Sequence, residues 1–473
     1  MTYSLHRRGF LKGALAAGAL VPLAACAGGG KPAETTKPSD TAKPTETGAP
    51  ANDAANPFGL QSPSKVEAII FKGGYGIAYA EFAGKLVEKN HDGVTVSVSP
   101  TTEVAKELQP RFTGGNPPDV IDNAGKGKIG LSAILSQLED LTPVVDAPNI
   151  EGTKIRDTLY AGALEPGTFD GKLAAINYVL TVFGLWYSAS LFEANGWTPP
   201  KTWDEALELG AKAKAAGKYL FLWGNEAADY YGEMAITSAI KEGGDEVRLA
   251  LDNLEEGCWS KPAIQGVFGK LKECVDKGYF KPGGSGTQFT AAQAAWSNAE
   301  EALLYPSGAW IENEMKDQTK EGFKMTGSPI PTVTASSKLP FDAIHSAADE
   351  AYIVPAQGKN VAGGKEFMRT MLSKEAATNF AKTILSPTIV KDTVPADAFG
   401  STALASQIKM LGAAGDNVFT WRFNSYYGLG TDHVQAWNSF LDGKMSVEEL
   451  TKALQDATDR VRNDDAIEKY KAS

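Results

Sequence analysis

The chain is poor in histidine. Its 473 residues include four histidines, His6, His91, His345 and His433. They are far apart in the sequence, whereas protein zinc sites usually draw their ligands from closely spaced residues. We therefore expect no metal site built on histidine, and, since the sequence has no GxGxxG or GxxxxGKS phosphate loop, no cofactor.

Cysteine is also scarce, and only Cys258 and Cys274 lie in the part expected to fold. A pair of cysteines invites a disulfide, but a helix is expected to begin at Pro262, in PAIQGVFGKLKECVDKG. Cys274 then lies about 18 Å along that helix, and the segment from Cys258 to Pro262 returns at most about 14 Å. A disulfide needs Cα atoms within about 7 Å. We expect two free thiols, although a doubled-back loop would allow a bridge.

Basic charge is scarce as well. The sequence has 46 Lys and Arg against 57 Asp and Glu, a formal net charge of −11. An acidic chain without a basic block binds nucleic acid poorly, so we expect no nucleic-acid partner. With 43% hydrophobic residues, the chain can bury a large core and is long enough for more than one domain.

The longest apolar run, from Ala14 to Ala25, is shorter than the roughly 20 residues that span a bilayer. Arg7 and Arg8 precede it in HRRGFLK, which resembles a twin-arginine export signal. The run ends in LAAC, which resembles a bacterial lipobox. We expect residues 1–25 to be the export signal and Cys26 to carry the lipid anchor. The alternative is an ordinary secretory signal that happens to end in cysteine.

Residues 26–64 are expected to form a disordered linker behind the anchor. The stretch is rich in Pro, Thr, Ala and charge, and has almost no apolar residues to bury. A flexible tether of this length has an r.m.s. span of roughly 35 Å. Folding is expected to begin at Lys65.

Strand-like and helix-like segments alternate after the linker. KVEAIIF, GVTVSVSP and PPDVIDNAG are expected to be strands. The alternation predicts an α/β fold with a mainly parallel sheet, and ligands of such sheets bind at the carboxyl ends of strands. The candidate ligand-binding residues at those ends are Tyr75, Glu103, Asp122 and Asn123. For Asp122 and Asn123, capping of a loop is an equal alternative.

Two later stretches carry a family resemblance. GLWYSASLF with PPKTWDEALELGAKAKAAGKYLFLWG, and then EEALLYPSGAWIENEM, resemble extracellular solute-binding proteins of carbohydrate ABC importers, the maltose-binding type. In the first stretch Thr202 is expected to cap a helix that begins at Trp203. Other runs, among them YFKPGGSGTQFTAAQAAWS and LSPTIVKDTVPADAFGSTALASQ, resemble the N-acetylglucosamine- and diacetylchitobiose-binding lipoproteins of chitin-using actinobacteria.

The resemblance implies a two-lobed, periplasmic-binding-protein-like (type II) α/β fold that closes on a sugar. We expect residues 65–178 and 309–370 in the first lobe, and 179–308 and 371–473 in the second. The chain is expected to cross between lobes near Tyr178–Thr181 and Tyr305–Gly308. A monomer of this family would deliver N-acetylglucosamine or diacetylchitobiose to two permease subunits and, through them, a cytoplasmic ATPase.

Sugar sites use aromatic rings against pyranose faces and polar side chains against hydroxyl rims. The sequence has nine tryptophans, and the resemblance carries the family's stacking tryptophan onto Trp310. The other candidates are Trp223, Tyr187, Trp421, Arg422, Asp349 and Glu350. The alternative for the aromatics is core packing, and for the two acids it is capping.

Two other functions stay open. A glycoside hydrolase needs two carboxyls roughly 5 to 10 Å apart, and Glu103, Asp122 and Glu350 could supply them, but no clustered acidic motif marks them. The same fold could instead bind another oligosaccharide or a polyol. We expect a binding protein and no enzyme.

Overall fold

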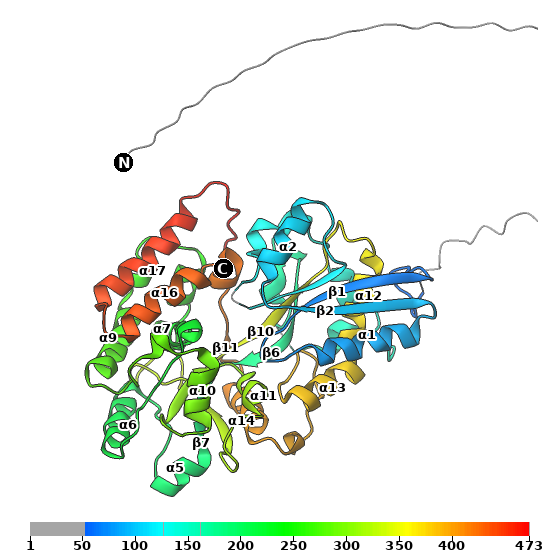
Figure 1. Cartoon of the computed structure of the whole chain (residues 1–473). Helices are drawn as coiled ribbons and strands as arrows, with labels where there is room; N and C mark the ends of the chain where they lie inside the picture. The colour runs from blue at the N-terminus through cyan, green and yellow to red at the C-terminus, as the bar shows by residue number, and fades with distance from the viewer. Residues whose placement is uncertain (1–52, 126, 161, 473) are drawn as a thin grey trace, which may run out of the picture. The chain divides into compact units, whose positions relative to one another are not determined.

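A six-stranded sheet, with strands from both halves of the chain, organises the first lobe (Figure 1). The computed structural model describes residues 53–472 except 126 and 161, so the expected export signal and Cys26 lie outside the described residues. The strands are β1 (Ser64–Phe71), β2 (Val94–Thr101), β3 (Val120–Asn123), β6 (Ile176–Val182), β10 (Ile344–Ile353) and β11 (Val418–Phe419). Strands β2, β1 and β3 are parallel neighbours, and β10 pairs antiparallel with both β3 and β6. The predicted α/β sheet is confirmed.

Helices cover both faces of this sheet. Successive side chains of a strand point to opposite faces, so Val120 packs with α1 (Ala78–Asn90) and α12 (Val361–Met371). Its neighbour Ile121 packs with α2 (Val104–Thr113). Figure 1 shows α1 and α2 on opposite sides of β1 and β2. Strand β3 is therefore buried on both faces.

The second lobe is built on a smaller sheet of β7 (Gly184–Ser188), β8 (Leu304–Ser307) and β9 (Met325–Ser328), with β7 in the middle. The helices packed in its cores are α6 (Trp203–Ala215), α7 (Tyr230–Gly243), α8 (Asp245–Asp252), α9 (Pro262–Asp276), α10 (Phe289–Ser297), α11 (Ile311–Met315), α16 (Gly430–Leu441) and α17 (Val447–Arg462). Helix α14 (Thr402–Ala414) packs on β9. The other α-helices of the described residues are α3 (Thr142–Asp146), α4 (Ile155–Thr158), α5 (Ala189–Asn195), α13 (Lys374–Ile384) and α15 (Phe423–Tyr427). Two strands of two residues each, β4 (Thr168–Phe169) and β5 (Lys172–Leu173), pair with each other.

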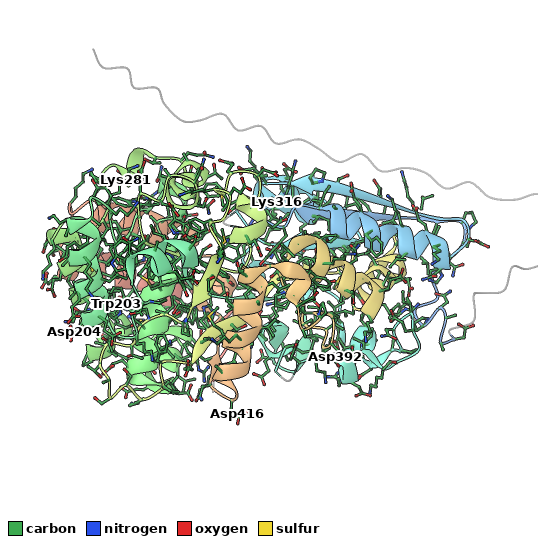
Figure 2. The ribbon with its side chains drawn as sticks, turned by 90° about the horizontal axis from the view of Figure 1, so that it is seen from below. Trp203, Asp204, Lys281, Lys316, Asp392 and Asp416 are labelled. Carbon is green, nitrogen blue, oxygen red and sulfur yellow. The ribbon has the colours of Figure 1, made fainter. Side chains whose placement is uncertain are left out.

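Two predictions about local structure in the second lobe are confirmed. The Thr202 hydroxyl accepts a hydrogen bond from the Glu205 N–H at 3.2 Å and caps α6. Trp203 is buried at the start of α6, and its neighbour Asp204 lies at the surface (Figure 2), 2.6 Å from the Lys270 ammonium.

Helix α9 begins at Pro262, and Cys258 and Cys274 are both buried free thiols. Burial raises the pKa of each thiol to about 12, so neither is a reactive thiolate near neutral pH.

From the strand pairings we propose passages between the lobes that differ from those expected. Tyr178–Thr181 lies inside β6, and the first passage is at Phe183, between β6 and β7. Ser307, where the second passage was expected, ends β8 in the second-lobe sheet. Strand β9 then adds to the same sheet, so the chain returns only over residues 329–343.

Packing also favours different lobe bounds. Ile311 and Met315 pack with Trp186 in a second-lobe cluster, although they fall in the 309–370 stretch expected in the first lobe. Phe380 of α13 packs with Tyr79 of α1 in the first-lobe core, although it falls in the 371–473 stretch expected in the second lobe. We therefore propose that residues 309–330 go with the second lobe and α13 with the first.

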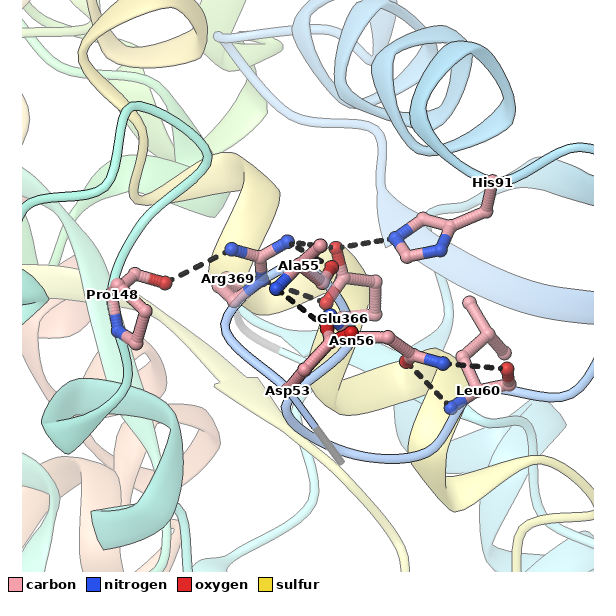
Figure 3. Close-up of polar contacts among 8 residues, drawn as sticks. All are labelled: Asp53, Ala55, Asn56, Leu60, His91, Pro148, Glu366 and Arg369. Atoms are coloured by element: carbon pink, nitrogen blue, oxygen red, sulfur yellow. Dashed lines mark hydrogen bonds and ion pairs between the residues drawn. The ribbon is translucent and has the colours of Figure 1, made fainter. Parts of the chain in front are cut away.

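The last part of the expected linker packs onto the first lobe (Figure 3). Asp53 accepts hydrogen bonds from the backbone N–H groups of Ala55 and Asn56 at 2.8 and 2.9 Å. The Asn56 amide both donates to the Leu60 carbonyl and accepts from its N–H. The Leu60 side chain is 3% exposed, within the core that contains Val66. The expectation of disorder up to residue 64 is wrong for residues 53–64, because Leu60 supplies an apolar anchor.

A buried ionic cluster holds this segment in place (Figure 3). Arg369 of α12 makes two 2.7 Å hydrogen bonds to Glu366 and donates to the Ala55 carbonyl at 3.2 Å and the Pro148 carbonyl at 2.9 Å. The His91 Nε2 atom lies 2.9 Å from the Glu366 carboxylate. The guanidinium thus joins α12 to two separate segments of backbone.

Removing residues 53–63 is expected to destabilise the domain. A chain that starts at Ser64 loses the burial of Leu60, worth about 1.5 to 3 kcal/mol for a leucine side chain, relative to a chain that starts at Asp53. The free energy of unfolding should fall by about 2 kcal/mol in urea titrations, and Leu60→Ala in the longer chain should account for most of the loss. Equal stability of the two chains would show that the segment contributes nothing.

Within the described residues, no helix combines the length and apolar character needed to cross a membrane.

Candidate functional site

A pocket lies at the passage from β6 to β7. The crossing residues Phe183 and Gly184 form one side, and the end of β8 with Gly308 forms another. The other lining residues are Tyr230, Glu233, Met234 and Thr237 of α7, Pro306 and Ser307 of β8, and Ile330. The chain runs between the two lobes here, so a molecule in this pocket would touch the connection between them.

Trp310 lies beside the pocket, directly before α11, and is half-buried. Its ring centre is 5.6 Å from that of Phe183 and 5.7 Å from that of Tyr230. The first-lobe Tyr75 meets it edge to face at 6.4 Å. The structure thus brings two predicted site residues, Trp310 and Tyr75, together between the lobes.

The loop that carries Tyr75 touches α11 directly. The Asn313 amide donates a hydrogen bond to the Gly74 carbonyl, and a Cβ on Gly74 would lie 3.1 Å from the Trp310 Cβ. A side chain at position 74 would therefore crowd the tryptophan. The absence of one lets the first-lobe backbone approach Trp310 closely.

His345 and Trp421 form a stack with Phe183, which lines the pocket. The His345 ring lies between Phe183 at 4.4 Å and Trp421 at 3.7 Å. Burial lowers the pKa of His345 to about 3, so the imidazole is neutral at physiological pH. Its Nδ1 atom is 4.0 Å from Glu233 Oε2, too far for a direct hydrogen bond.

Asp122 and Glu350 lie in the core of the first lobe. Asp122 is fully buried opposite Tyr352 in the pairing of β3 with β10. The Tyr352 and Tyr79 hydroxyls share a 2.6 Å hydrogen bond. Burial, followed by the charge of Asp122 and a smaller effect of Glu350, raises the pKa of both tyrosines. Glu350 has a φ of 57°, which is rare for a side chain other than glycine and marks local backbone strain.

Several predicted site residues have structural contacts instead. The Asn123 amide donates to the Ile129 carbonyl and accepts from the Ile129 N–H, both at 2.8 Å, which is the loop capping considered as the alternative. Trp223 is 2% exposed and donates to Asn438 at 3.2 Å. Tyr187 packs on Phe192 at 4.6 Å. These contacts favour a role in packing over one in binding.

Arg422, Glu103 and Asp349 complete the predicted set. The Arg422 guanidinium donates to the Thr168 carbonyl at 2.8 Å and lies over the Phe169 ring, so it joins the late region to the first lobe. Glu103 is exposed at the start of α2. Asp349 pairs with Val179 through the backbone of β10, and its side chain is outside the description.

Sequence reasoning missed four residues that line the pocket and one, His345, that lies beside Glu233. They are Phe183, Tyr230, Glu233, Ser307 and His345. Tyr230 and Glu233 are three apart at the start of a helix, which places them on one face, and Ser307 precedes the Gly-Ala-Trp element already singled out. These two signals were available. The sequence suggests His345 only as a possible metal ligand, and no residue near it in the sequence indicates its stacking partners.

Comparison with known proteins gives the family. The model of bacterial extracellular solute-binding proteins matches residues 72–378. The diacetylchitobiose binding protein NgcE of Streptomyces coelicolor is 55% identical over 99% of both chains. The multiple sugar-binding protein of Streptococcus mutans is 22% identical over 64% of this chain and 70% of its own.

Solved structures show the same fold at low sequence identity. A chitin oligosaccharide binding protein has a TM-score of 0.69 at 19% identity, covering 84% of this chain and 98% of its own. RafE in complex with raffinose has a TM-score of 0.65 at 21% identity, covering 84% of this chain and 100% of its own. The chain has their two-lobed α/β fold, and it belongs to the bacterial extracellular solute-binding protein family.

Proposed function

We propose that this chain is the sugar receptor of an ABC importer and that its ligand is N-acetylglucosamine, N,N'-diacetylchitobiose or both. The observation that carries the proposal is the half-buried Trp310, which lies beside a pocket and against Tyr75 of the other lobe. An aromatic face next to polar groups suits a pyranose ring. The 55% identity to a diacetylchitobiose binding protein supports the choice of sugar.

Sugar binding is proposed to favour the closed arrangement of the lobes. Contacts such as that between Asn313 and Gly74 join the second lobe to the first. A ligand that touches both lobes at once binds the closed state better than the open one, and only this difference in affinity shifts the equilibrium. The closed, loaded form would then be recognised by the importer.

The proposed partners and location follow from the family and from the first residues of the sequence. The loaded receptor delivers its sugar, as a monomer, to two permease subunits and through them to an ATPase. Export by the twin-arginine route and a lipid on Cys26 hold it at the outer face of the membrane. Two acyl chains give firm anchoring, because each buried methylene contributes about 0.8 kcal/mol.

A sugar panel tests the proposed ligand. Ligand that binds only the folded protein stabilises it by about 2.7 kcal/mol at a hundredfold excess over Kd. Thermal melting of the chain from Asp53 onward should therefore shift upward with N-acetylglucosamine or its dimer and remain unchanged with glucose and maltose. A shift with raffinose or another saccharide alone would keep the receptor role and reject the amino sugar.

A further inference from the structure

Two polar side chains line the pocket beside Trp310, and a third lies next to one of them. Glu233 and Ser307 line it, and the Nδ1 atom of His345 lies 4.0 Å from the Glu233 carboxylate. Ser307 and His345 are each 4% exposed. Among the described residues, neither Ser307 Oγ nor His345 Nδ1 has a hydrogen-bond partner. Buried polar atoms are nearly always bonded, so the unbonded Ser307 hydroxyl at the pocket, with the His345 nitrogen close to Glu233, indicates a polar ligand group here.

Apolar side chains form most of the rest of the pocket wall, which also includes Tyr230 and Thr237. Phe183, Met234 and Ile330 line it together with Pro306, and Met234 and Ile330 are each 2% exposed. A ligand group that fits must therefore combine hydrogen bonding with a small apolar end. An acetamido group has an N–H donor, a carbonyl acceptor and a methyl group.

We propose that this pocket forms a recess for the N-acetyl group of the sugar that stacks on Trp310. Glu233 accepts the amide N–H, Ser307 donates to the acetyl carbonyl, and the methyl packs against Met234 and Ile330. His345 is neutral, so it contributes one donor or one acceptor at Nδ1. The inference rests on the proposed function, and it assigns the residues that separate N-acetylated sugars from plain ones.

Selectivity follows from the buried polar atoms. A sugar with a hydroxyl in place of the acetamido group leaves the methyl space empty and Ser307 or His345 without a partner. Sites built to bond a polar group reject analogues that lack it by large factors. The recess would therefore select for the acetamido group more strongly than the aromatic stack, which accepts any pyranose face.

The test compares N,N'-diacetylchitobiose with cellobiose, which has hydroxyls in place of the acetamido groups. Wild type should bind diacetylchitobiose at least about a hundredfold more tightly. Ser307→Ala should reduce this ratio of affinities about tenfold, because one neutral hydrogen bond is lost. Glu233→Gln should reduce it about ten- to a hundredfold, because a charge-assisted hydrogen bond is lost. Glu246→Gln, an exposed carboxylate on α8, is the matched control and should leave the ratio unchanged. Melting of the unliganded variants shows that they are folded.

A second measurement changes the ligand. The N-propionyl analogue carries one more methylene and should bind wild type more weakly than the N-acetyl sugar, and Met234→Ala should reverse that order by making room. One result would reject the recess as the acetamido site even though wild type binds diacetylchitobiose. In it, Ser307→Ala and Glu233→Gln weaken the binding of both sugars equally or of neither, and Met234→Ala still binds the N-acetyl sugar more tightly than the N-propionyl one. If wild type does not bind diacetylchitobiose, the proposed function itself fails.

Discussion

Replacing Trp310 by alanine is expected to weaken sugar binding by about ten- to a hundredfold. The ring already lies against Tyr75, Phe183 and Tyr230, so it offers a fixed face to a pyranose. Loss of an aromatic contact of this size corresponds to about 1.5 to 3 kcal/mol, and each 1.4 kcal/mol is about a tenfold change in Kd. Calorimetric titration with the sugar that stabilises wild type measures the effect.

Trp197→Ala is the matched control for this prediction. Trp197 is also partly buried, but it packs on Phe192 against the second-lobe core. The Trp197→Ala variant should be less stable than wild type, but its Kd for sugar should stay within about twofold of the wild-type value. Trp310→Phe should keep part of the affinity, because a smaller ring remains. Unchanged binding in Trp310→Ala would remove this residue from the site.

The largest loss of stability is expected from Arg369→Ala. Arg369 and Glu366 are buried, with side chains 3% and 0% exposed. Removing one partner of a buried pair leaves the other charge uncompensated and typically costs about 3 to 5 kcal/mol. The Ala55 and Pro148 carbonyls lose a donor at the same time. Chemical unfolding monitored by tryptophan fluorescence measures the difference.

An exposed ion pair gives the comparison. Arg460 lies 2.8 Å from Asp432, with the side chains 61% and 52% exposed. Arg460→Ala should cost no more than about 1 kcal/mol, because solvent screens such pairs. Similar losses in the two variants would show that the Arg369 cluster is not the anchor described above. Neither Arg369 nor Arg460 lines the pocket beside Trp310, so neither variant should alter the Kd for sugar.

The sequence predicted the first sheet well because its signals are local. Strands β1, β2 and β3 lie in apolar runs that alternate with helical segments. Pro262 and Thr202 mark the starts of helices, because proline is favoured at the first helical position and threonine as the cap before it. The passage between lobes carries no such signal. INYVLTVFGLWY is mostly apolar. The chain leaves the first sheet after Val182 and enters the second at Gly184, where a Cβ would lie 2.8 Å from the Ser328 carbonyl oxygen. Only tertiary contact reveals that point.

The candidate site was predictable in part for the same reason. Trp310 was found through a resemblance, and Tyr75 through its place after a strand. Trp223 and Tyr187 satisfy the same sequence criteria, yet their rings pack in the second lobe. An aromatic residue near a strand end looks alike in a core and in a binding site. His345 was missed because its neighbours, Phe183 and Trp421, are distant in sequence.

The position of residues 53–64 has a mechanical consequence. Tension applied to the chain before Asp53 would pass through the Ala55 carbonyl to Arg369 and so into α12 of the first lobe. The strands and loops that join the lobes, from Phe183 to Gly184 and over residues 329–343, lie outside this path. A pull through the proposed anchor would therefore reach the first lobe without crossing the connections between the lobes.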